Sequence, residues 1–150
     1  MAVYDYEIGT TLTGESADMV NVEELFDDGE DNIDHTKACP APKGMAVMPY
    51  GKYRQTISGL EYGDGWPSVI WVYDVMTQEH WDALVNEYLT SGAQSARVYI
   101  RTRIDDEGSY SYYYCVMHRP KIGEEATYEN RAWRNVRIRF THMELEEDPV

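Results

Sequence analysis

Hydrophobic and polar residues change their spacing abruptly near the middle of the chain. In Trp66–Val75 (WPSVIWVYDV), branched and aromatic residues recur in steps of two, which is typical of a strand. Apolar residues then recur at three- and four-residue intervals, the stripe of an amphipathic helix. Thr77 can cap this helix and Gly92 can end it. The switch predicts one helix, at about 77–90, packed on a sheet. The residues expected in the core are Val69, Trp71, Trp81, Leu84, Val85, Val98, Ile100, Ile138 and Phe140.

Further strands are predicted on both sides of this element. The stretch YRQTISGLE (Tyr53–Glu61) is predicted to be a strand, with YGDG as the turn that follows it,. Ser95–Ile104 and Ser109–His118 flank a short DDEG turn, which predicts a β-hairpin. Arg134–Glu146 is predicted to be the last strand. The order is strand, strand, helix, hairpin, long loop, strand, and it predicts a mainly antiparallel β domain with one helix.

Composition and charge limit the function classes. A chain of 150 residues suits a single domain with a real core,. Its formal net charge of -14 argues against a nucleic-acid binder, since phosphate contacts need a basic surface,. No apolar run has the length of a membrane span, and the first residues lack the pattern of a secretory signal. We therefore expect a protein made in the cytoplasm, with Cys39 and Cys115 reduced.

The acidic residues are concentrated at the beginning of the chain. Residues 1–50 hold 11 acidic and two basic residues, and residues 51–150 hold 16 and 11. We interpret residues 1–48 as an acidic N-terminal arm, because they have too few apolar residues for a core of their own. Residues 49–147 are then the β domain and 148–150 a short tail. The arm is either a solvated segment or one that folds onto a neighbouring subunit.

Two predicted strands place arginine and tyrosine opposite their apolar residues. In Ser95–Ile104 and Arg134–Glu146 the two sets alternate, so they lie on opposite faces. This face is either solvated, with arginines that discourage edge pairing, or an interface between copies of an acidic chain. The tyrosines of SYSYYYCVMH divide between both faces of their strand, which favours packing or interface use over a carbohydrate platform. The candidate interface residues are Arg97, Tyr99, Arg101, Arg103, Arg137 and Arg139, with Glu23, Glu24, Asp27, Asp28, Glu30 and Asp31 as their acidic partners on a neighbouring copy.

Candidate catalytic or metal-binding patterns are absent from the sequence. It contains no nucleophile elbow, no phosphate-binding glycine loop and no zinc-protease motif,. The four histidines are far apart and show no ligand spacing with either cysteine,. We expect His80 on the helix surface, and His118 and His142 exposed at strand ends. The stretch DDGEDNID resembles a calcium loop only in its first three ligand positions, Asp28, Glu30 and Asn32. Ile33 stands in place of the required glycine and Cys39 in place of the bidentate glutamate,. The sequence predicts no enzyme, no cofactor and no metal site.

Several motifs together resemble small structural proteins of bacteriophage tails. They are a glycine turn followed by Pro-x-x-x-Trp, then Met-Thr-x-x-x-Trp-Asp-Ala-Leu, and a strand ending in Ile-Arg-Thr. A tyrosine-rich strand ending in Met-x-Arg-Pro follows, and then Trp-x-Asn-Val-x-Ile-Arg-Phe-Thr-His. The resemblance covers residues from about 46 to 147. It implies a tail-tube or distal-tail protein, with a β-sandwich or barrel and one flanking helix, that assembles into hexameric rings.

The resemblance also sets expectations for partners and location. Ring assembly requires usable strand edges and complementary charges between copies. The expected partners are other copies of the chain and other phage tail proteins, in a virion tail assembled in the host cytoplasm. An acidic lumen would let DNA slide without sequence-specific binding, and no membrane is involved. The alternatives are a monomeric module that binds one partner through its acidic arm, or a tail terminator or adaptor protein.

Overall fold

The computed structural model describes residues 5–22, 42, 44–104 and 110–146. The strands before the helical segment are β1 (Glu7–Gly9), β2 (Val20–Asn21), β3 (Gly44–Met48), β4 (Lys52–Gln55), β5 (Glu61–Asp64) and β6 (Ser68–Thr77). The helical segment consists of α1 (Gln78–Trp81), the π-helical η2 (Asp82–Asn86) and the 3₁₀ turn η3 (Thr90–Gly92). The strands after it are β7 (Ser95–Thr102), β8 (Ser111–His118), β9 (Thr127–Glu129) and β10 (Ala132–Glu146).

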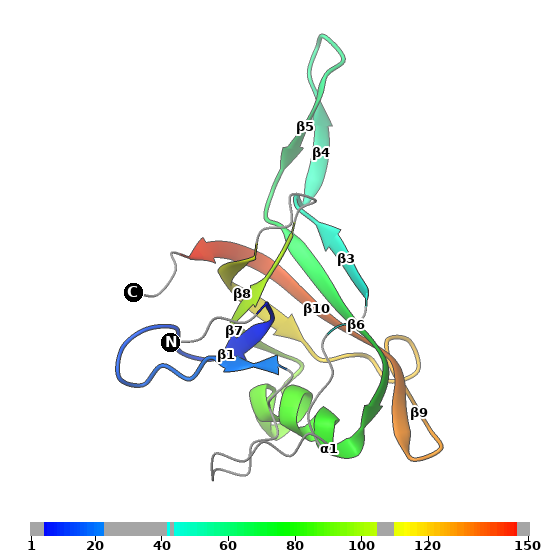
Figure 1. The fold of residues 1–150 in the computed structure, drawn as a ribbon. Coiled ribbons are helices and arrows are strands. Elements are labelled where there is room, and N and C mark those ends of the chain that lie inside the picture. The colour runs from blue at the N-terminus through cyan, green and yellow to red at the C-terminus, as the bar shows by residue number, and fades with distance from the viewer. Residues whose placement is uncertain (1–4, 23–41, 43, 105–109, 147–150) are drawn as a thin grey trace.

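Eight of the described strands form one open sheet. Its order is β2-β1-β7-β8-β10-β6-β3, and β9 pairs with the beginning of β10 (Figure 1). Each of these strand pairs is antiparallel. The predicted class, mainly antiparallel β with one short helix, is therefore confirmed. The sandwich or barrel is not confirmed, because the two end strands of the sheet, β2 and β3, do not pair with each other.

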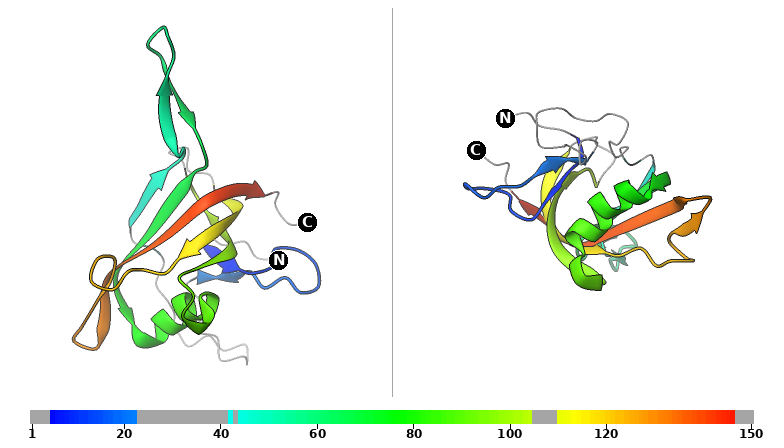
Figure 2. Two further views of the ribbon diagram at one scale, coloured as in Figure 1. Left: turned by 180° about the vertical axis from the view of Figure 1, so that it is seen from behind. Right: turned by 90° about the horizontal axis from the view of Figure 1, so that it is seen from below.

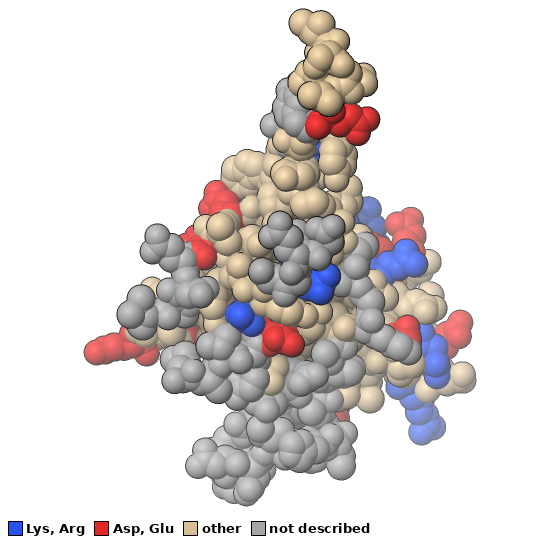
Figure 3. Space-filling view, turned by 45° about the horizontal axis from the view of Figure 1, so that its top comes forward, with Lys and Arg blue, Asp and Glu red and all other residues tan. Residues whose placement is uncertain are grey.

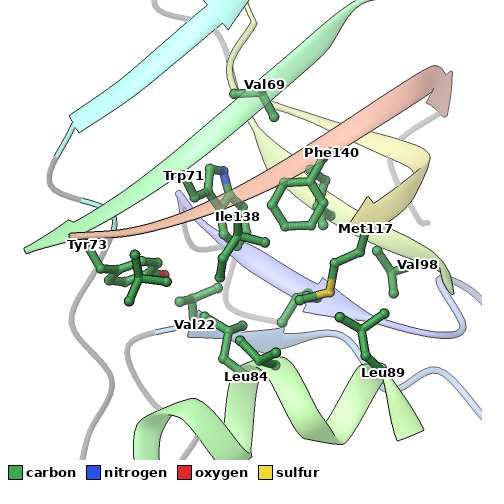
Figure 4. Packing of buried hydrophobic residues seen from close by; sticks show 14 of the residues in the cluster. Val22, Val69, Trp71, Tyr73, Leu84, Leu89, Val98, Met117, Ile138 and Phe140 are labelled. Atoms are coloured by element: carbon green, nitrogen blue, oxygen red, sulfur yellow. The ribbon is translucent and has the colours of Figure 1, made fainter. Parts of the chain in front are cut away.

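The sheet curls around its apolar face, and the helical segment packs against that concave face (Figures 1 and 2). In β6 the indole nitrogen of Trp71 donates a hydrogen bond to the Thr102 hydroxyl of β7, at 3.2 Å, although β10 and β8 lie between these strands. The Trp71 ring also meets the edge of Tyr6, with 5.8 Å between ring centroids. Figure 4 shows sheet and helix side chains converging in this core. All nine residues predicted for the core are buried.

The helix begins where the sequence predicts. The Thr77 hydroxyl accepts a hydrogen bond from the backbone N–H of His80, at 3.2 Å, and so caps the first turn,. Trp81 stacks on Trp133 of β10 with 3.9 Å between ring centroids. The first turn is α-helical, the backbone continues as a π-helix through η2, and residues 87–88 are α-helical again. The expectation that His80 lies on the surface is wrong, because it is buried, as is Trp81 next to it.

Parts of the predicted N-terminal arm belong to the sheet. In β1, Ile8 pairs with Ile100 of β7 and is fully buried, and Val22 is fully buried just after β2. Near the other end of the arm, β3 pairs with β6. These apolar residues are too few for a separate core, and they join the core of the β domain instead. The acidic candidates from Glu23 to Asp31 lie outside the described residues.

The predicted strand Tyr53–Glu61 is instead a hairpin. Residues 52–55 form β4, residues 61–64 form β5, and the chain turns at 56–60. The backbone N–H of Gly59 donates to Thr56 O, and Thr56 N–H donates to Leu60 O. The turn prediction at YGDG was also wrong, because most of that stretch lies in β5. The hairpin points away from the rest of the molecule (Figure 1).

Candidate interaction surface

The register of the sheet places the predicted arginines on one face. Arg97 pairs with Val116 of β8, and Val116 pairs with Thr141 of β10. His118 of β8 pairs with Arg139. Because directly paired residues of neighbouring strands point to the same side, the arginines of β7 and β10 lie on the face opposite the helix. We name this the outer face, and the prediction that these arginines oppose the core residues is confirmed.

A cluster of aromatic and charged residues occupies the part of the outer face near β1. The Tyr112 hydroxyl donates to a carboxylate oxygen of Glu7 at 2.9 Å, and both residues are buried. The guanidinium of Arg101 lies over the rings of Tyr110 and Tyr112, 5.6 Å from each centroid, within cation–π range. Arg101 also donates to Tyr110 O at 3.4 Å. These contacts make Arg101 a packing residue of the subunit, so it is poorly placed to meet a neighbouring copy.

Arg139 also has a partner within the subunit. Its Nε donates to a carboxylate oxygen of Glu125 at 2.9 Å, and both side chains are partly shielded from solvent. The backbone oxygen of Glu125 accepts a hydrogen bond from Arg137 N–H at 2.8 Å. The loop before β9 is thereby held against β10, and the Arg139 charge is largely satisfied inside the molecule. Arg103 follows the end of β7 and is half-buried.

On the outer face Arg97 and Arg137 are exposed, and Tyr99 of β7 and Tyr114 of β8 are half-buried. Arg97 lies 5.3 Å from the Tyr114 ring centroid, and Tyr99 packs against Tyr114 at 4.6 Å. Burial, then the nearby carboxylates of Glu146 and Glu144, raise the pKa of Tyr99. Among the described residues, neither Arg97 nor Arg137 makes an ion pair within 4.0 Å.

A hollow lies where the outer face meets the base of the β4–β5 hairpin. Its volume is about 450 Å³, and it is lined by Gly51, Trp66, Ser68, Thr141 and His142. His142 has a φ of 53° and is the extra residue where the β8–β10 register shifts by one. This bulge turns its ring toward Trp66, at 5.5 Å between centroids,. His142 is exposed, as predicted.

The histidine next to this hollow is less exposed than predicted. The Nε2 atom of His118 and the Thr141 hydroxyl form a hydrogen bond of 2.7 Å. Burial, then the positive charges of Arg139 and His142, lower the pKa of His118. The described residues bring no acid into contact with these two histidines that would complete a nucleophile–base–acid arrangement. The described residues also contain no group of three or more histidine, cysteine or acidic side chains close enough to hold a metal ion.

The thiol of Cys115 is buried in the sheet. Cys115 of β8 is fully buried and donates weakly to Val98 O, at 3.7 Å. Burial raises the pKa of the thiol well above its usual range, which disfavours the reactive thiolate. Cys39 lies outside the described residues. No helix within the described ranges is both long and apolar enough to cross a membrane.

Sequence reasoning missed the hairpin and the internal partners of the arginines. The Ser58-Gly59 pair is a turn signal inside the stretch predicted as one strand, and it would have located the hairpin. Arg101 lies over the Tyr112 ring, and Tyr112 bonds to Glu7 of β1. This cluster had no local signal, because 105 residues separate Glu7 from Tyr112. Comparison of the chain with protein-family models, curated proteins and solved structures finds no match.

Proposed function

We propose that this chain is a structural protein that assembles with copies of itself, as a ring-forming component of a bacteriophage tail. The observation that carries self-assembly is the exposed Arg97–Arg137 part of the outer face on a chain of net charge -14. Exposed arginines on a chain of this net charge can meet the acidic groups of another copy,. The tail assignment rests on the resemblance of the sequence motifs.

The open sheet supports the same proposal. Its end strands β2 and β3 each pair with one neighbour among the described strands, and an unpaired strand edge can extend into another subunit's sheet. The described residues form no second layer over the outer face. Arginine and tyrosine are enriched at protein–protein interfaces, which favours a protein partner. The net charge of -14 favours a second copy of this acidic chain as that partner.

The charge-reversal variant Arg97→Glu/Arg137→Glu tests this function. Arg131→Glu, in the exposed turn between β9 and β10, is the matched control. Size-exclusion chromatography with light scattering measures the oligomeric state, and electron microscopy shows whether rings form. We expect the double variant to assemble at least about tenfold more weakly, which corresponds to about 1.4 kcal/mol, while the control assembles normally.

Two outcomes would contradict the proposal. A wild-type chain that stays monomeric at high concentration would favour the alternative of a monomeric partner-binding module. Normal assembly of the double variant would show that the outer face is merely solvated. Thermal melting of the dissociated subunit separates these outcomes from a loss of folding, since both arginines are exposed and their replacement should change stability by about 0.5 kcal/mol or less.

A further inference from the structure

The β4–β5 hairpin extends from the body, and β4 and the turn that follows it are exposed. All four residues of β4 are exposed, and Tyr53, Ile57 and Leu60 are 63%, 110% and 69% exposed. Figures 1 and 2 show the hairpin standing clear of the sheet and helix, and Figure 3 shows a tip without charged side chains. An isolated two-stranded hairpin is marginally stable in water and usually needs a packing partner. Among the described strands, none pairs with this two-stranded element.

The hairpin nevertheless has a defined local structure. At its tip the Leu60 N–H donates to the Thr56 hydroxyl at 3.2 Å, in addition to the backbone bonds of the turn. At its base the Tyr50 ring lies against Gly63, where any larger residue would overlap it, and it meets Tyr53 edge-on at 5.9 Å. Gly65 has a φ of 88°, which a residue other than glycine rarely adopts,. The exposed apolar residues are thus presented on a shaped element.

The two strands of the hairpin carry opposite charge. Lys52 and Arg54 lie in β4, and Glu61 and Asp64 lie in β5. The two-stranded sheet consists of these strands alone among the described ones, so each has one edge without a neighbouring strand. Pairing β4 with β4 of another copy would place basic residues near basic residues, and pairing β5 with β5 would do the same for acids. Pairing β4 with β5 brings opposite charges together, and like charges opposite each other destabilise a sheet.

We propose that the hairpins of neighbouring copies pair edge to edge, β4 of one copy against β5 of the next. When all hairpins point the same way, this contact continues the antiparallel alternation of strands from copy to copy. The contact is heterologous, so repetition closes a ring or forms an open helical array. Side by side, the exposed Tyr53, Ile57 and Leu60 of successive copies would bury one another. This inference rests on the proposed self-assembly and assigns it a second contact, distinct from the outer face.

Charge-reversed hairpins test the pairing directly. Lys52→Glu/Arg54→Glu makes both strands acidic, and Glu61→Lys/Asp64→Lys makes both strands basic. Each variant alone should assemble at least about tenfold more weakly than wild type, because every β4–β5 contact then joins like charges. An equimolar mixture should recover assembly, because acidic and basic hairpins can alternate around the assembly. Native mass spectrometry should show both masses in each oligomer.

The hairpins of the two double variants carry charges of a single sign and could fail to fold for that reason. The variant that carries all four substitutions avoids this problem. Its strands again carry opposite charges, with the order exchanged. It should assemble with itself and exclude wild-type subunits, because a mixed contact would join β4 and β5 of like charge. Free mixing of this variant with wild type would overturn the proposal, and so would normal assembly of both single-strand variants.

Wild-type behaviour distinguishes this proposal from the one on which it rests. A strictly monomeric wild type would remove the proposed function as well. Wild-type rings that tolerate every hairpin variant would remove only the hairpin contact and leave the outer-face interface in place. Near-ultraviolet circular dichroism of each variant confirms that the core around Trp71 and Trp81, remote from the hairpin tip, stays folded.

Discussion

Single residues with several partners stabilise the joints between elements of this protein. Arg119, just after β8, is the clearest case. Its guanidinium donates to the backbone oxygens of Leu89 and Ala93 at 2.6 and 2.9 Å, and to the Asn86 side-chain oxygen at 2.9 Å. The carbonyls at the end of a helix lack intrahelical partners and carry partial negative charge. Arg119 therefore ties the end of the helical segment to the sheet.

Replacing Arg119 with Met should remove these three hydrogen bonds while keeping an apolar stem. Because hydrogen bonds to charged groups contribute about 1.5–3 kcal/mol, we expect the free energy of unfolding to fall by about 2–3 kcal/mol. Urea denaturation measures the change. Arg131→Met, in an exposed turn, is the control and should change stability by about 0.5 kcal/mol or less. Equal effects of the two substitutions would show that the Arg119 bonds add no stability.

The lowered pKa of His118 predicts a pH dependence of stability. The unfolded chain binds a proton near the ordinary histidine pKa of about 6.5, and the folded chain binds it only at lower pH. Below about 6.5 the unfolded state thus holds more protons, so stability should fall as the pH falls. Urea midpoints of wild type and His118→Gln should diverge between about pH 7.5 and about pH 5, with the variant less sensitive. Parallel curves would contradict this.

At the scale of elements, one aromatic stack packs the first turn of the helix against the sheet. Trp81 is 3% exposed and lies on Trp133, whose indole N–H donates to the Gln78 side-chain oxygen at 3.0 Å. This contact compensates for the short regular α-helical part, since isolated short helices are unstable in water. It also explains why Trp133, at the beginning of a 15-residue strand, faces the helix.

Trp81→Ala should destabilise the protein by about 3–5 kcal/mol, the usual cost of removing a buried aromatic side chain. Denaturation by urea measures it, with Glu79→Ala on the exposed side of the same turn as the control. A loss below about 1 kcal/mol would mean that the indole is not part of the core.

The base of the hairpin should be sensitive to the size of residue 63. In Gly63→Ala the new methyl group would overlap the Tyr50 ring, so the ring must move and the β4–β5 ladder should loosen. Amide hydrogen exchange at Gly59 and Leu60, which donate hydrogen bonds in the turn, should become faster,. The double variant Tyr50→Ala/Gly63→Ala should restore slower exchange if the overlap is the cause. Unchanged exchange in the single variant would contradict a fixed Tyr50 position.

At the scale of the whole molecule, assembly should depend on salt. The proposed outer-face and hairpin contacts both join opposite charges at exposed positions. Raising the salt concentration from about 0.1 M to about 1 M shortens the screening length from about 10 Å to about 3 Å. We therefore expect the oligomer to dissociate at a higher protein concentration in high salt than in low salt, as measured by light scattering. Assembly that strengthens with salt would instead indicate a contact dominated by apolar burial.

The sequence by itself determined the features that depend on local spacing. Period-2 alternation separated the arginines of β7 and β10 from the core, and the helical stripe located Trp81 and Leu84. The Thr77 cap was also predictable, because it needs only residues within one turn. These patterns act over a few residues, so the order of residue types along the chain is sufficient to reveal them.

Only the tertiary structure decided which of these residues remain available to a partner. Glu7 of β1 bonds to Tyr112, Glu125 in the loop before β9 bonds to Arg139, and β1 pairs with β7. These contacts occupy residues that alternation alone leaves exposed. Likewise, the turn at Ser58-Gly59 converts one predicted strand into a separate hairpin with two edges. Partner choice and strand register depend on which distant segments fold together, and hydrophobic spacing carries no information about that.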